Sequence, residues 1–292
     1  MRGRVLRGRE HTILGGYAAF AEGRSAVAVS MGGAPKRYPH HDPNEDVSAF
    51  AQGEGGVLLV AADGHGGHQA AEIAVDELLK RMGTHWTGAN VPDFNSTWSR
   101  DVRDLSWGLH TAILEASPSG ATHPSRTTLT AALVRPGDEF LAYFSVGDSH
   151  LFHVGDSDVV DLACAAEERP CFLGNAALTR AELDHNCVVG FENLRGTRAV
   201  LVATDGFSEV GIGFDQPEAE VAAIHAQSLD VPREQRALAI VRGLIDQALS
   251  THRDRNAGDN VACGVTWLGE DFEPEGGDIP GSAQNPSPNA RE

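Results

Sequence analysis

The chain has 292 residues, enough to bury a large hydrophobic core, and its formal net charge is −18. A surface of this sign would repel nucleic acid and anionic membranes, so neither is expected as the main partner, and no apolar run approaches the about 20 residues needed to cross a bilayer. The four cysteines show no C-x-x-C spacing, so we expect reduced thiols in a cytoplasmic protein.

Apolar periodicity and turn residues predict eleven elements. In chain order they are strands over 25–32, 47–51 and 56–62, helices over 68–82 and 97–116, strands over 127–135, 139–147, 150–155 and 199–204, a helix over 233–252 and a strand over 260–268. Several strands follow one another with no helix between them, so a regular βαβ alternation is absent. The pattern predicts an α+β fold with mainly antiparallel sheets flanked by helices.

Two turn sequences separate three of these consecutive strands. Pro136-Gly137-Asp138 lies between the strands over 127–135 and 139–147, and Gly147-Asp148-Ser149 lies before the strand over 150–155. Both are typical of tight turns, so we expect two antiparallel hairpins here.

The composition changes near residue 269, where Pro, Gly, Asn and acidic residues replace large apolar ones. Such a segment cannot bury enough surface to offset its ordering entropy, which predicts a disordered acidic tail over 269–292. We find no comparable linker before it.

Carboxylates recur where turns meet apolar strands. Taken one at a time, each is explained by ordinary turn chemistry. Strand ends can nevertheless lie side by side, and converging carboxylates repel one another unless a cation is present. An all-oxygen set of this kind suits Mg²⁺ or Mn²⁺ rather than zinc. The set comprises Glu45, Asp46, Asp63, Asp148, Asp205, Glu209 and Asp259.

The order "NED … DGHGG … GDS … DGFSE … DN", from Asn44 to Val261, resembles the metal-dependent type 2C serine/threonine protein phosphatases, the PPM family. Because the motifs reach both ends of the ordered part, the resemblance implies one phosphatase domain over residues 1–268. It also implies a four-layer αββα sandwich with two Mg²⁺ or Mn²⁺ ions at one edge. The implied activity is hydrolysis of phosphoserine and phosphothreonine in proteins.

The resemblance also implies site residues, transferred position by position. Asp63 would bridge the two metals, and the Gly64 carbonyl would help to bind one of them. The other metal would be completed by Asp205 and Asp259.

Glu45 and Asp46 would act directly or through water, which makes Asp46 part of the catalytic set. Asp148 and Glu209 match positions of a third, weaker metal. Glutamate stands at the second of them, where aspartate is usual, and its extra methylene moves that carboxylate outward.

His65, next to Asp63 and Gly64, is the candidate general acid. A departing serine or threonine alkoxide is a poor leaving group and needs a proton, which an imidazole can supply. We interpret His68 as a capping or surface residue, and Thr127 and Thr128 as strand formers.

The chain departs from the family pattern at the substrate side. Many members carry a phosphate-binding arginine at the position of His41, so we expect Arg37, or His41 together with His40, to contact phosphate instead. The flap that contacts substrate proteins in the family lies in the segment corresponding to 156–198, and the sequence does not locate it.

Three functional hypotheses follow. The first is a phosphatase of phosphoserine and phosphothreonine proteins, the substrates of Ser/Thr kinases. The second keeps the site but takes a small phosphorylated metabolite or nucleotide. The third is a catalytically inactive relative that binds phosphoproteins.

Overall fold

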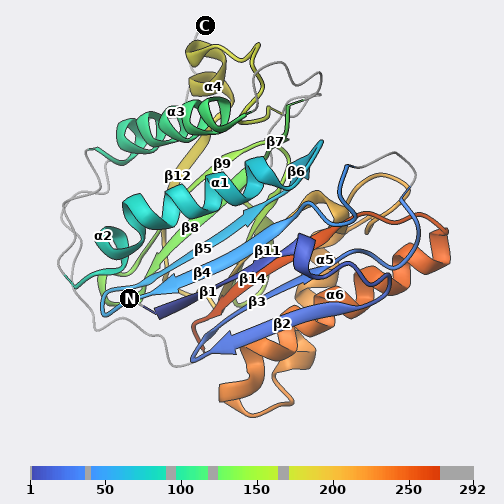
Figure 1. The fold of residues 1–292 in the computed structure, drawn as a ribbon. Helices are drawn as coiled ribbons and strands as arrows, with labels where there is room; N and C mark the ends of the chain where they lie inside the picture. Colours follow the sequence, from blue (N-terminus) through green and yellow to red (C-terminus); the bar gives the residue numbers. More distant parts are fainter. Residues whose placement is uncertain (1, 37–40, 90–96, 118–123, 164–170, 270–292) are drawn as a thin grey trace, which may run out of the picture.

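Two large antiparallel sheets pack face to face, with helices on their outer faces, as the computed structural model shows (Figure 1). The structure describes residues 2–36, 41–89, 97–117, 124–163 and 171–269. This arrangement confirms the expected α+β fold with mainly antiparallel sheets. Arg37 and the tail beyond residue 269 lie outside the described residues.

The first sheet has six strands. In spatial order they are β1 (Arg2–Arg7), β4 (Val47–Gln52), β5 (Val57–Ala62), β8 (Leu129–Arg135), β9 (Phe140–Val146) and β12 (Val188–Asn193). Helices α1 (Gln69–Leu78) and α3 (Trp98–Ala116) cover its outer face (Figure 1). A π-turn (Leu79–Gly83) continues α1 into α2 (Thr84–Thr87), and α4 (Arg180–Asn186) lies against α3.

The second sheet also has six strands. Their spatial order is β11 (Val159–Asp161), β10 (His150–Val154), β13 (Ala199–Ala203), β14 (Val261–Trp267), β3 (Ser25–Ser30) and β2 (Tyr17–Glu22). Its outer face is covered by α5 (Pro217–Ser228) and α6 (Arg236–Arg255). A two-stranded ribbon of β6 (Gly64–His65) and β7 (Arg126–Thr127) stands apart from both sheets.

Strand β5 shows why the central strands are unbroken apolar runs. Leu58 and Val60 pack in the core beneath α1 and α3, whereas Leu59 and Ala61 pack between the two sheets. Both faces of the strand are therefore buried, and an alternating polar face is not needed. Burying each large aliphatic side chain contributes about 1.5–3 kcal/mol to folding.

All three predicted helices and all eight predicted strands are present. Elements that the sequence analysis did not predict include β1, β2, β12 and α5. The first three are edge strands, and the exposed arginines of β1, Arg2 and Arg4, obscured its pattern. Helix α5 buries few side chains, chiefly Val221 and Ile224, so its apolar face is too short to be recognised from the sequence.

One of the two predicted hairpins is wrong. The Pro136–Asp138 turn joins β8 to β9 as expected, and these strands pair along their whole length. After Gly147, however, β10 enters the second sheet and pairs with β13. Gly147 adopts a φ of +107°, which a side chain would disfavour, and lets the chain change sheets. Asp148 consequently lies on the crossing between the sheets.

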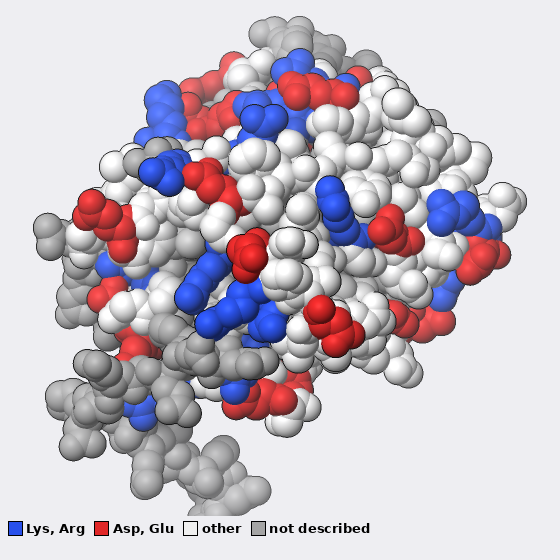
Figure 2. Space-filling view, turned by 90° about the horizontal axis from the view of Figure 1, so that it is seen from below, with Lys and Arg blue, Asp and Glu red and all other residues white. Residues whose placement is uncertain are grey.

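Charged side chains on the face seen from below lie in small groups of both signs, among many uncharged residues (Figure 2). Within the described residues, no helix is both long and apolar enough to span a membrane. Among the described residues, Cys171, Cys187 and Cys263 form no disulfide, and Cys164 lies outside this part of the chain.

Candidate metal and active site

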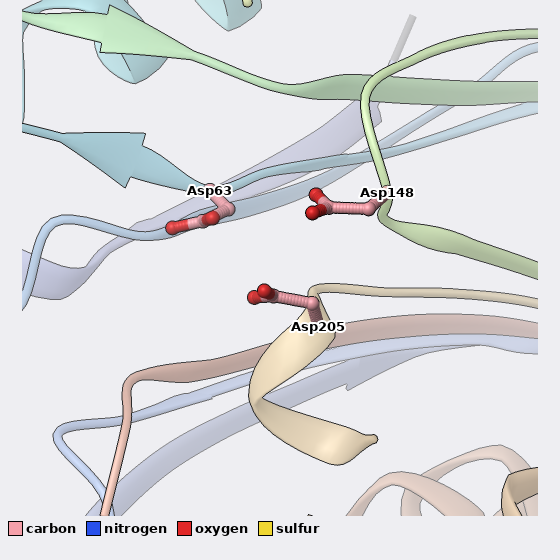
Figure 3. A group of neighbouring side chains, drawn as sticks. All are labelled: Asp63, Asp148 and Asp205. Atoms are coloured by element: carbon pink, nitrogen blue, oxygen red, sulfur yellow. The ribbon is translucent and has the colours of Figure 1, made fainter. Parts of the chain in front are cut away.

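Three aspartates converge at one edge of the sandwich. Asp63 follows β5, Asp148 lies on the crossing from β9 to β10, and Asp205 begins the 3-10 turn Asp205–Phe207 after β13. Each offers a carboxylate oxygen within 4.8 Å of the others, and the three side chains point toward a common space (Figure 3). The two sheets and the segment that joins them therefore all contribute to this group.

Two further predicted carboxylates lie in the same electrostatic environment. Burial, and then the charge of Asp259, raises the pKa of Asp46 to about 7. Burial, followed by the charge of Asp205 and other carboxylates that include Asp259, raises the pKa of Asp63 well above its usual range. The structure thus brings Asp46, Asp63, Asp205 and Asp259 together, as the sequence analysis expected.

This carboxylate cluster, defined as Asp46, Asp63, Asp148, Asp205 and Asp259, fits a divalent cation. The Oδ1 atom of Asp46 and the Oδ2 atom of Asp63 are buried and accept no hydrogen bond from the described residues. Buried carboxylate oxygens are normally satisfied, and a hard cation such as Mg²⁺ or Mn²⁺ takes ligands of this kind.

Two hydroxyl groups hold the backbone of Asp63, a role that the sequence analysis missed. Thr127 Oγ1 donates to the Asp63 carbonyl at 2.7 Å, and the Asp63 amide donates to Thr128 Oγ1 at 3.0 Å. Thr128 in turn shares a 2.8 Å hydrogen bond with Ser149, next to Asp148. Thr127 ends β7 as a strand residue, whereas Thr128 lies between β7 and β8, and both hold the backbone at Asp63.

Lys36 and Asn260 are also part of the site without having been predicted. The Lys36 ammonium lies 3.5 Å from Asp259 Oδ1, its side chain is 9% exposed, and it donates to the Asn260 amide oxygen. The same oxygen accepts the Glu45 amide at 2.9 Å. The position of Asn260 after Asp259 was the available signal, whereas nothing local marked Lys36 as buried.

Glu45 organises the loop that leads into the cluster. Its Oε1 atom accepts the backbone amides of His41 and Asp42, at 3.0 and 2.9 Å. The Glu45 carbonyl would lie 2.4 Å from a Cβ atom at position 64, so only glycine fits there. This close approach places the Gly64 backbone beside the cluster.

His65 lies at the rim of the cluster. Its Nδ1 atom is 3.2 Å from Asp63 Oδ2, and its side chain is 32% exposed. Gly66 and Gly67 follow with φ values of +75° and +127°, so the chain turns sharply after the histidine. His68 opens α1 and contacts Asp42 at 2.7 Å, consistent with a structural role.

The remaining predicted residues lie further out. His41 is exposed, and the contact that places it is its backbone hydrogen bond to Glu45. Glu209 is close enough that its charge contributes to the raised pKa of Asp205, after burial and the charges of Asp148 and Asp259. Among the described residues, the group that meets within 4.8 Å contains Asp148 and not Glu209.

Comparison with known proteins decides the family. A sequence model described as protein phosphatase 2C matches residues 35–249, well over half of the chain. The chain belongs to this family. It is accordingly an enzyme of the protein serine/threonine phosphatase class, as the resemblance implied. A search of curated protein sequences found no match.

Solved structures of other phosphatases share the fold of this phosphatase 2C member. A bacterial serine phosphatase superposes with a TM-score of 0.61 at 16% identity, covering 85% of this chain and 99% of its own. For the serine-threonine phosphatase 2C of Toxoplasma gondii the TM-score is 0.62 at 13% identity, covering 86% and 99%. For the serine/threonine phosphatase PstP/Ppp of Mycobacterium tuberculosis it is 0.53 at 19%, covering 87% and 98%.

Proposed function

We propose that this phosphatase hydrolyses phosphoserine and phosphothreonine in proteins with the help of two Mg²⁺ or Mn²⁺ ions held by the carboxylate cluster. The observation that carries the proposal is the pair of buried carboxylate oxygens, on Asp46 and Asp63, that accept no hydrogen bond from the described residues. Without a cation, the cluster is a concentration of like charge that the fold must stabilise at a cost.

The ligands are assigned by position in the cluster. Asp63 extends from the first sheet and Asp205 from the second, so they are the residues best placed to bind ions between the sheets. Asp46 and Asp259 complete the set, with the Gly64 carbonyl and Glu45 as contributors from the adjacent loop. Asp148 lies close enough to serve as a ligand of a third ion or of the central pair.

When bound, two divalent ions lower the pKa of a shared water molecule and offset negative charge on the phosphoryl oxygens. They also allow a protein with a net charge of −18 to bind a phosphate dianion. His65 is placed at the rim, where it can protonate the departing serine or threonine oxygen. Its Nδ1 atom lies 3.2 Å from Asp63 Oδ2, on the side of the cluster.

The first experiment measures hydrolysis of an aryl phosphate with Mn²⁺. We expect activity that is lost on adding a chelator, restored by excess Mn²⁺ and reduced at least about 100-fold by Asp205→Asn. Asp254→Asn, an exposed change on α6, is the matched control and should retain activity. Activity that survives both the chelator and Asp205→Asn would refute the metal mechanism.

A second measurement addresses the substrate. Phosphoserine and phosphothreonine peptides are compared with a panel of phosphorylated metabolites and nucleotides at equal concentration. A higher kcat/KM for the peptides supports the proposal, whereas preference for one small molecule would favour the alternative function. Phosphopeptide binding without turnover would indicate an inactive relative.

A further inference from the structure

His65 stands on a small platform with two other side chains. In the ribbon of β6 and β7, His65 pairs directly with Arg126 across the strands, so the two side chains project on the same face. Leu173 forms an antiparallel bridge with Thr127. The neighbouring Phe172 ring lies beneath the Arg126 guanidinium. We call His65, Arg126 and Phe172 the rim platform.

Aromatic contacts hold the platform together. The Phe172 ring lies 4.6 Å from the His65 ring, centroid to centroid. The guanidinium carbon of Arg126 lies over the same phenylalanine ring, 4.6 Å from its centroid. A guanidinium that rests on a ring face keeps its N–H donors, which lie in its own plane, available to a ligand.

Arg126 is exposed, and its guanidinium makes no ion pair or hydrogen bond with any described residue. Several other arginines of this acidic chain are paired, such as Arg7 with Asp76 and Arg9 with Glu72. Arg126 is therefore a cation beside the candidate general acid whose hydrogen-bonding capacity is not used within the described fold.

The position of Arg126 selects which part of a substrate it can reach. Arg126 lies about 5 Å from His65 across the ribbon. With His65 at the leaving-group oxygen, Arg126 would reach a point about this distance from the scissile bond. An extended peptide advances about 3.3 Å per residue, so this distance corresponds to a residue one or two positions from the phosphoserine. The residues that line a cavity of about 420 Å³ include Gly66 and Ser125, the chain neighbours of His65 and Arg126.

We propose that Arg126, seated on Phe172, is a specificity residue that binds an acidic side chain next to the phosphorylated residue of the substrate. The inference rests on the proposed phosphopeptide hydrolysis and adds the substrate class. A planar guanidinium can bind a carboxylate through two parallel hydrogen bonds. The net negative charge of the protein disfavours binding of acidic peptides, so a cation at this position would have a large effect on their binding.

The test compares two sets of phosphoserine peptides. One set carries glutamate one or two positions before or after the phosphoserine, and the other carries glutamine at the same positions. For the wild-type enzyme we expect kcat/KM to favour the acidic peptide. Arg126→Gln should reduce this preference about tenfold, mainly through KM, and Arg126→Lys should retain part of it. Arg4→Gln is the matched control, because Arg4 is also exposed and lies over a phenylalanine ring, Phe20, on the edge strand β1.

Charge reversal provides a second, independent readout. Arg126→Glu should invert the preference in favour of peptides with lysine at the same positions. An unchanged preference in Arg126→Gln, or an equal loss on both peptides and on an aryl phosphate, would overturn the assignment. The second result would mean that Arg126 binds the transferred phosphoryl group itself. If the wild-type enzyme hydrolyses neither peptide, the proposed function fails, and this outcome is distinct from loss of the preference.

Discussion

Thr204 donates a hydrogen bond from Oγ1 to Oδ2 of Asp46 at 2.8 Å, across the interface between the two sheets. The same hydroxyl accepts the Ala262 amide at 2.9 Å, so its single proton is directed at the carboxylate. Asp46 is thereby oriented with its other oxygen, Oδ1, buried and accepting no hydrogen bond from the described residues. The residue that follows β13 of the second sheet thus orients a carboxylate at the start of β4 in the first.

This relationship predicts the effect of Thr204→Val. The valine keeps the shape but removes the donor, so Asp46 should be less well oriented and more readily protonated. We expect the Mn²⁺ concentration for half-maximal activity to rise about tenfold, which corresponds to ~1.4 kcal/mol. Thr204→Ser retains the hydroxyl and should stay close to the wild type. Equal values for the two variants would contradict the role of the hydrogen bond.

Asp148 and Glu209 should differ in their importance for metal binding. The Asp148 carboxylate meets those of Asp63 and Asp205 within 4.8 Å, whereas Glu209 does not join this group. We therefore expect Asp148→Asn to weaken Mn²⁺ binding, measured by calorimetry, by about tenfold or more. The isosteric Glu209→Gln should change it much less. A larger effect at Glu209 would show that the group of three is not the principal site.

The role of His65 predicts a dependence on the leaving group. An aryl phosphate releases a stable phenolate that does not need a proton, whereas phosphoserine releases a basic alkoxide. His65→Asn should therefore reduce kcat for a phosphoserine peptide by about 100-fold and affect an aryl phosphate far less. Similar losses on both substrates would remove His65 from the role of general acid.

The metal-free protein should lose stability as the pH rises. The pKa of Asp46 is raised from 3.8 to about 7 in the fold, chiefly by burial and the charge of Asp259, and those of Asp63 and Asp205 are raised as well. The folded state then binds more protons than the unfolded state between about pH 4 and 7, so the free energy of unfolding falls through this window.

Thermal unfolding in a chelator, followed from pH 5 to pH 8, measures this effect. Each titrating carboxyl contributes up to about 1.4 kcal/mol per pH unit, and Asp46→Asn should flatten the dependence. Added Mn²⁺ should raise the melting temperature most at high pH, because the ion replaces the protons. A melting temperature that rises with pH in the chelator would contradict the raised pKa values.

Much of the fold could be predicted from the sequence, because strands buried on both faces, such as β5, are unbroken apolar runs that end at a turn. Asp63 and Asp205 were recognisable for the same reason, since Asp63 directly follows such a run and Asp205 follows one after Thr204. Edge strand β1 was not recognisable, because exposed arginines interrupt its pattern and its pairing with β4 is a long-range contact.

Other features depend on contacts that local sequence does not encode. The Gly147-Asp148-Ser149 turn looks like a hairpin, and only the pairing of β10 with β13 shows that it crosses between sheets. Lys36 became part of the site through its contact with Asp259, more than 200 positions away along the chain. The sequence analysis did not predict α4, although the start of this helix carries a local signal, the T-x-x-E capping box of Thr179 and Glu182.

The crossing at Asp148 has a mechanical consequence for the whole sandwich. Its two sheets meet at this edge through carboxylates, so a bound cation would bridge them and hold the sheets together. Removing the cation should increase local opening at this edge, and amide hydrogen exchange near Gly64 and Gly206 should become faster. The apolar seam deeper between the layers, around Phe50 and Leu59, should stay protected.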